Sequence, residues 1–235
     1  GVTTVITGNC GVSAAPLPPR GPLPMPLDLI EVPEGQRATR FADYLQSLRA
    51  QPAAVNMAAL VGHTSLRACV MSSLDRAATS DEITRMQHLL EEALQAGAIG
   101  MSSGTFYPPA RHAPMAELIE VGRPLSARQA LYTTHMRDEG DDILSSLHET
   151  FEIGRTLDVP VVVSHHKIRG QHNQGQSRVT LPLIRDHMRH QCVGLDCYPY
   201  DASSTMIHAD PAMLSGRALI ASSEPHPDCA GRFLH

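Results

Sequence analysis

Three side chains of the kinds that bind zinc stand at the carboxyl ends of three predicted strands. Cys10, His135 and His165 each follow a short run of β-branched or other apolar residues. A thiolate and two imidazoles make a plausible three-ligand zinc set that leaves a fourth position free for water. Zinc lowers the pKa of such a water molecule, which then acts as a nucleophile near neutral pH. The spacing is not a local motif, so the prediction rests on all three residues following strands.

Alternating strands and helices are predicted to hold these residues. Runs of β-branched residues indicate strands, and apolar stripes at helical spacing indicate helices between them. Thr79 and Glu82 form a capping-box pattern, and the helix after them is predicted to end near Gly97. We expect Pro124 to interrupt one helix and Pro182 to lie in the first turn of another. The predicted strands span 2–8, 55–61, 99–103, 131–134, 159–163 and 193–197, and the other predicted helices span 40–50, 115–121, 141–157 and 180–190.

The order of these elements predicts an α/β fold built from six βα units. Polar or reactive residues follow each strand, which favours a TIM-type (β/α)8 barrel, because its chemistry lies at the carboxyl ends of many strands. The alternative is an open doubly wound sheet, which would gather the chemistry near one switch point. Six strands cannot close an eight-stranded barrel, so we expect a partial one. Residues 1–235 would form this single incomplete domain, with a proline-rich loop at 11–35 that serves the site.

Composition excludes several classes of function. The chain carries 19 Lys and Arg against 24 Asp and Glu, which argues against a polybasic binder of nucleic acid or membrane surfaces. No apolar run approaches the ~18 residues of a transmembrane helix. Five scattered cysteines, an odd number, favour free thiols in a cytoplasmic enzyme. The chain begins at Gly1 within a predicted strand, so we expect it to be an internal fragment of a longer protein.

Six short motifs occur in one order along nearly the whole chain. Together they resemble the N-acyl-D-amino-acid deacylases (D-aminoacylases) of the amidohydrolase superfamily, and they are specific as a set. The resemblance implies a zinc-dependent hydrolase that cleaves the amide bond of N-acyl-D-amino acids to a carboxylate and a D-amino acid. Its partner would be this small molecule, and no feature decides the oligomeric state. The motifs are Gly8-Asn9-Cys10-Gly11, Gly62-His63, Ser102-Ser103-Gly104-Thr105-Phe106-Tyr107-Pro108-Pro109, Thr134-His135-Met136-Arg137-Asp138-Glu139, Ser164-His165-His166-Lys167 and Tyr198-Pro199-Tyr200-Asp201-Ala202-Ser203-Ser204-Thr205.

The resemblance also implies a metal site. Cys10 would take the bridging place that a carboxylated lysine occupies in many relatives, and residues 102–107 contain no lysine. His135 and His165 would complete one tight Zn²⁺ site. A second, weaker site would need an HxH pair on a strand before Gly1, and this chain contains no HxH.

The resemblance also implies residues that bind and activate the substrate. Tyr107 would polarise the scissile carbonyl, and Phe106 would line the side-chain pocket. Lys167, Tyr198 and Ser204 would bind the substrate carboxylate, a task that suits charged and hydroxyl donors.

The remaining catalytic parts are expected outside these residues. The general-base aspartate and a further substrate-binding arginine would lie beyond His235. The chain would then correspond to barrel strands two to seven, and the 235 residues alone would have little or no activity.

Three other functions stay open. A cyclic amidase of the dihydroorotase or hydantoinase type is disfavoured by the missing strand-end lysine and by the Gly-Asn-Cys-Gly motif. A cysteine nucleophile would pair Cys10 with a histidine and would need no metal. A non-catalytic remnant would bind zinc without turnover.

Several nearby residues are given supporting or structural roles. Taken alone, Cys10 would more commonly be a small buried side chain than a ligand, and the matching motif reverses that expectation. We expect Arg137, Asp138 and Glu139 to form an ion-pair cluster that orients His135. The residues predicted to be structural or to support a ligand are His63, His166, Cys69, Cys192 and Cys197, and His226, Cys229 and His235 have no assigned role.

Overall fold

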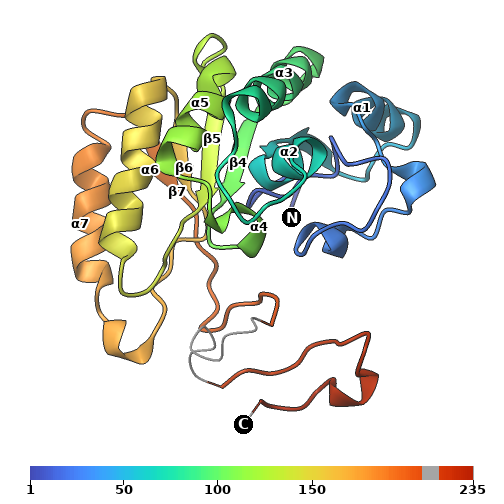
Figure 1. The fold of residues 1–235 in the computed structure, drawn as a ribbon. Helices are drawn as coiled ribbons and strands as arrows, with labels where there is room; N and C mark the ends of the chain where they lie inside the picture. Colours follow the sequence, from blue (N-terminus) through green and yellow to red (C-terminus); the bar gives the residue numbers. More distant parts are fainter. Residues whose placement is uncertain (208–216, 235) are drawn as a thin grey trace.

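Parallel strands joined by helices form the framework of the chain (Figure 1). A computed structural model describes residues 1–207 and 217–234. Within them, two strands form a parallel ribbon in the order β1-β2, and five form a parallel sheet in the order β3-β4-β5-β6-β7. The strands are β1 (Thr4–Thr7), β2 (Asn56–Ala59), β3 (Val61–Gly62), β4 (Gly100–Gly104), β5 (Leu131–His135), β6 (Val161–Val163) and β7 (Val193–Leu195).

Helices connect the paired strands, as parallel pairing requires. Figure 1 shows α3, α5, α6 and α7 beside the five-stranded sheet. Helix α2 packs against β3 and β4, and α1 packs against α3. No helix in the described part of the chain is long and apolar enough to cross a membrane. The α-helices are α1 (Phe41–Ala50), α2 (His63–Val70), α3 (Ser80–Ala96), α4 (Pro108–Arg111), α5 (Met115–Ser126), α6 (Ile143–Leu157) and α7 (Ser177–His187).

An apolar core between the helices and the sheet holds the framework together. Leu90 of α3, Leu118 of α5 and Phe151 of α6 are all buried, as are Met101 of β4 and Val161 of β6. Burying a large apolar side chain stabilises a fold by roughly 1.5–3 kcal/mol. The core thus fixes β5 and β6, whose carboxyl ends carry two of the three candidate ligands.

The amino-terminal half differs from the prediction in one place. The run at 55–61 is two strands, because β2 pairs with β1 and β3 pairs with β4. Helix α2 follows β3 directly and was not predicted. It has no side-chain cap; instead the backbone N–H groups of Thr64 and Ser65 both donate to the Gly11 carbonyl. That contact is distant in sequence, so no local pattern reveals the helix.

Two predictions about proline were wrong. Pro124 lies inside α5 and does not end it. The carbonyl that it leaves without a helical partner is that of Glu120, four residues earlier, and this carbonyl accepts a 2.6 Å hydrogen bond from Gln87 Nε2. Pro182 lies beyond the first turn, because α7 begins three residues earlier than predicted, at Ser177.

The remaining predicted elements agree with the structure within a few residues, and the short helix α4 (Pro108–Arg111) was not predicted. The Thr79 and Glu82 capping box is present, and Gly97 ends α3 in a left-handed conformation. The proline-rich stretch at 11–35 is irregular apart from short 3-10 turns at Leu27–Ile30 and Glu34–Gln36. His235 and residues 208–216 lie outside the described residues.

Candidate metal centre

A tight turn after β1 presents the Cys10 thiol. Cys10 and Gly11 both have positive φ, at 57° and 78°. Gly11 is required here, because a Cβ at this position would lie 2.8 Å from the backbone nitrogen of Gly104. The Gly11 N–H also donates to Ser102 Oγ at 3.0 Å. The turn is therefore held against β4 by its own backbone.

Two histidines from neighbouring strands complete the cluster. His135 is the last residue of β5, and His165 follows β6, where its N–H donates to Asp196 Oδ1 at 2.6 Å. His165 Nε2 lies 3.3 Å from Cys10 Sγ. One ligand atom of each of the three residues lies within 4.8 Å of the others. The structure thus brings together the three predicted zinc ligands from widely separated parts of the sequence.

The His135 imidazole is buried without hydrogen-bond partners among the described residues. Its side chain is 7 % exposed, and neither ring nitrogen has a hydrogen-bond partner among the described residues. Burial lowers its pKa to about 3, so the ring is neutral. Buried polar atoms without partners are rare in folded proteins, and a neutral imidazole is the form that binds a metal ion. The donor set therefore fits a zinc ion.

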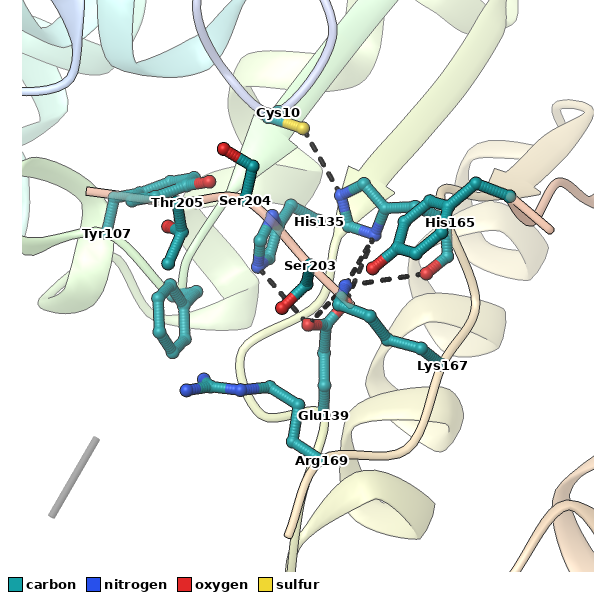
Figure 2. A pocket seen from close by; sticks show the side chains of 12 residues that line it. Cys10, Tyr107, His135, Glu139, His165, Lys167, Arg169, Ser203, Ser204 and Thr205 are labelled. Carbon is teal, nitrogen blue, oxygen red and sulfur yellow. Dashed lines mark hydrogen bonds and ion pairs between the residues drawn. The ribbon is translucent and has the colours of Figure 1, made fainter. Parts of the chain in front are cut away.

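A buried carboxylate lies behind both histidines (Figure 2). Glu139 is 1 % exposed; it lies 3.1 Å from His165 Nδ1 and 3.7 Å from His135 Nε2. Its carboxylate also accepts a 2.6 Å bond from Lys167 Nζ. Burial raises the pKa of Glu139, but contacts with His165, His135 and Lys167 outweigh it and hold the pKa at about 2. The carboxylate is therefore ionised and ties three site residues together.

The predicted ion-pair cluster around His135 is only partly correct. Arg137 points away and donates to Glu149 at 2.7 Å. Asp138 accepts the backbone N–H groups of Gly140 and Asp142. Of these three residues, only Glu139 faces the histidines. The side chains of consecutive residues in this loop point in different directions.

A cavity of about 130 Å³ opens over the cluster. All eight predicted site residues line it: Cys10, Phe106, Tyr107, His135, His165, Lys167, Tyr198 and Ser204. Sequence reasoning missed four further lining residues or gave them another role: Glu139, Arg169, Ser203 and Thr205. Ser203 and Thr205 flank Ser204 in one motif, and Arg169 lies two residues after Lys167, so proximity to predicted residues was the available signal.

Aromatic rings form one wall of this cavity. The Phe106 ring stacks on His135 with centroids 5.1 Å apart, and the Tyr107 and His135 centroids are 4.8 Å apart. Burial raises the pKa of Tyr107 to about 12, so its hydroxyl keeps its proton. The Arg169 guanidinium lies 5.0 Å from the Phe106 centroid. A protonated hydroxyl donor therefore lies next to the cluster, which is the arrangement needed to stabilise negative charge on an oxygen atom.

Other predicted residues lie away from the cavity. His166 makes a 3.0 Å hydrogen bond to Thr180 Oγ1, which agrees with a structural role. Cys192 and Cys197 are exposed, so the prediction that they are structural residues was wrong. Cys69 is partly buried, and this burial raises its pKa to about 12, which suits an inert thiol.

Comparison with known proteins identifies the relatives of this chain. No family model matches it. A D-aminoacylase of Alcaligenes xylosoxydans xylosoxydans is 58% identical over 234 residues, which cover 100% of this chain and 48% of the relative. The chain thus spans about half the length of the curated relatives it matches.

Two solved structures share the fold. A crystal structure of a D-aminoacylase, described as defining a novel subset of amidohydrolases, superposes with a TM-score of 0.96 at 56% identity and covers 100% of this chain and 49% of that one. An N-acyl-D-glutamate deacylase from Bordetella bronchiseptica, complexed with zinc and a phosphonate inhibitor, gives a TM-score of 0.93 at 40% identity and covers 99% and 49%. Over its whole length, the chain is therefore similar in sequence and in fold to D-aminoacylases, which are amidohydrolases.

Proposed function

We propose that this protein is a zinc-dependent hydrolase that cleaves the amide bond of N-acyl-D-amino acids, giving a carboxylate and a D-amino acid. The observation that carries the proposal is the approach of Cys10, His135 and His165 within 4.8 Å beneath the cavity that Tyr107 lines. The relatives support it, because they are named as D-aminoacylase and N-acyl-D-glutamate deacylase, and the latter holds zinc.

The three ligands would each offer one defined atom. Cys10 offers Sγ, and His165 offers Nε2, since its Nδ1 faces Glu139. His135 Nε2 faces the same carboxylate, which leaves Nδ1 for the ion. A zinc ion bound here supplies Lewis-acid chemistry that activates water and polarises a carbonyl.

The residues around the ligands would hold the substrate. The Tyr107 hydroxyl would donate to the carbonyl oxygen of the scissile amide, where negative charge develops. Lys167, Tyr198 and Ser204 would bind the α-carboxylate, and Phe106 would form the apolar wall of the side-chain pocket. Because Glu139 holds Lys167 Nζ at 2.6 Å, the ammonium group is positioned before substrate arrives. Proton transfer to the leaving amine needs a general acid, which the resemblance assigns to an aspartate after His235.

A partial barrel is proposed together with the function. We infer that residues 1–235 are one domain and form strands two to seven of a (β/α)8 barrel. The sequential order β3-β4-β5-β6-β7, without the reversal that marks a doubly wound sheet, supports this. The cytoplasmic location stays a prediction; the five cysteines, all free in the described residues, agree with it.

A cysteine nucleophile is a second candidate, because Cys10 Sγ lies 3.3 Å from His165 Nε2. A thiol next to an imidazole is the usual arrangement for nucleophilic cysteine. A cysteine-nucleophile mechanism gives no role to the unpartnered ring nitrogens of His135, whereas a zinc site uses one of them. We therefore place the zinc hydrolase first.

Metal removal separates these two functions. The whole protein is expected to lose deacylation of N-acyl-D-amino acids after dialysis against a chelator and to regain it when Zn²⁺ is added. N-acyl-L-amino acids serve as the control substrates. Activity that survives chelation but is blocked by thiol alkylation would instead select the cysteine nucleophile.

Glu139→Gln is expected to weaken zinc binding by about 10–100-fold, the usual cost of losing a partner that orients a ligand. The amide keeps the size of the side chain but loses the charge that orients His165 and holds Lys167. Competition with a fluorescent chelator measures the affinity. Glu149→Gln is the matched control, because Glu149 pairs with Arg137 away from the cavity. An affinity within twofold of the unmodified protein would show that Glu139 does not orient the ligands.

A further inference from the structure

A buried charged network lies outside the lining of the cavity and is not part of the proposed chemistry. Arg67 of α2 and Glu117 of α5 form an ion pair in which both side chains are at most 1 % exposed. His63, also fully buried, lies 3.2 Å from the same Glu117 oxygen. Burial lowers the pKa of His63, so the ring is neutral and the network holds one cation and one anion.

The hydrogen bonds of Arg67 are directed at backbone carbonyls. Its Nε donates to Pro109 O at 2.8 Å, and one terminal nitrogen donates to Leu74 O at 3.0 Å and to Arg76 O at 2.7 Å. Glu117 in turn accepts the Ala78 N–H at 2.8 Å. A buried ion pair is weak evidence for stability, because desolvating the two charges offsets their attraction. Donors that converge on the carbonyls of α4 and of the 74–76 loop instead indicate that the network fixes the position of these two segments.

One of these carbonyls belongs to the turn that presents Tyr107. Pro109 lies two residues after Tyr107. The same turn is closed on its other side by the Tyr107 N–H, which donates to Gly104 O at 3.1 Å, and by the Ala110 N–H, which donates to Tyr107 O at 3.0 Å. The Tyr107 backbone is therefore bonded to β4, and Arg67 holds the segment that follows it through the Pro109 carbonyl.

The opposite end of α2 holds the Cys10 turn. The Thr64 and Ser65 N–H groups donate to Gly11 O at 3.0 and 3.3 Å. Ser65 Oγ also accepts the Ser13 N–H at 2.9 Å. One short helix thus contacts both the turn after the candidate ligand Cys10 and, through Arg67, the turn that carries Tyr107.

We propose that Arg67 is a positioning residue: paired with Glu117, it fixes Tyr107 relative to Cys10 through the Pro109 carbonyl. The catalytic consequence rests on the proposed function, but the positioning itself does not. Arg67 touches neither the cavity nor the candidate ligands. Its substitution is therefore expected to move Tyr107 while the metal site stays intact.

The direct test places 3-fluorotyrosine at position 107 of the whole protein and records its ¹⁹F resonance. Arg67→Lys keeps the charge but loses the fork of donors. The variant is expected to shift or broaden the resonance at 107, to leave a label at the exposed position 200 unchanged, and to keep the affinity for Co²⁺ within about twofold. Arg123→Lys, in the exposed pair with Glu120 on α5, is the control and should leave the resonance at 107 unchanged.

An unchanged resonance at 107 together with a lowered Tm would overturn the proposal, since a purely stabilising ion pair predicts that result. Should Arg67→Lys fail to fold, Glu117→Gln removes the charge that holds Arg67, and the same two outcomes apply. This readout needs no turnover, so it stands even if the proposed reaction is wrong.

If the whole protein catalyses deacylation, its kinetics provide a second test of the proposal. Arg67→Lys is expected to lower kcat by about 10–100-fold, because a small displacement of a catalytic group is costly. In a Tyr107→Phe background the same substitution should have little further effect, since coupled residues are not additive. Equal losses in both backgrounds would contradict positioning through Tyr107.

Discussion

Replacing Cys10 with alanine is expected to weaken zinc binding by more than about 100-fold and to abolish deacylation. Loss of a group that merely orients a ligand costs about 10–100-fold in affinity, and loss of a ligand itself should cost more. Cys10 is also the only thiol among the three clustered ligands in the described residues. Its thiolate supplies the negative charge that offsets the ion, which neither imidazole can do.

Cobalt substitution provides the clearest measurement of this effect. Co²⁺ bound by a thiolate gives a sulfur-to-metal absorption band, which should be present in the unmodified protein and absent from Cys10→Ala. Cys197→Ala is the matched control, because Cys197 also follows a strand but is exposed and does not line the cavity. Retention of the band, or a zinc affinity within tenfold in Cys10→Ala, would show that Cys10 is not a ligand.

The candidate ligands could be predicted because they follow directly from strand order. Cys10, His135 and His165 lie at the carboxyl ends of β1, β5 and β6. Parallel strands end at one edge of their sheet, so His135 and His165 meet there without any local motif. Cys10 follows β1 of the separate ribbon and lies beside them because its turn is bonded to β4. The sequence pattern therefore identifies the cluster once the strands are recognised.

The structures that support the site could not be predicted in the same way. Helix α2 begins where its N–H groups meet the Gly11 carbonyl, and α5 continues through Pro124 because Gln87 satisfies the freed carbonyl. The sequence around Arg67 does not mark it as buried, and only packing shows that it is fully buried. Long-range hydrogen bonds decide these features, and propensity or periodicity does not contain them.

In the loop after β5, the sequence likewise does not show which single residue contacts the histidines. Three consecutive charged residues follow Met136, and the pattern gives no reason to separate them. Only Glu139 reaches His135 and His165, whereas Arg137 pairs with Glu149. The side-chain directions depend on the turn that the loop takes before α6, so charge pattern predicts a cluster but not its members.

Tyr107→Phe is expected to lower kcat by about 10²–10³-fold, the usual cost of removing one donor that stabilises a developing oxyanion. Phenylalanine keeps the ring that packs against Phe106 and His135, so the wall of the cavity is preserved. Zinc affinity should therefore stay within about twofold and KM should change little. The loss would then be confined to the transition state, where the carbonyl oxygen gains charge.

Steady-state kinetics of the zinc-loaded whole protein, together with the metal content of each variant, measure this effect. Tyr200→Phe is the matched control, because Tyr200 lies in the same motif as Tyr198 but is 74% exposed. A variant that keeps its zinc and its kcat would exclude Tyr107 as the donor and leave stabilisation of the carbonyl to the metal ion alone. A rise in KM at constant kcat would instead place Tyr107 in ground-state binding, since such a change removes an interaction that substrate and transition state share.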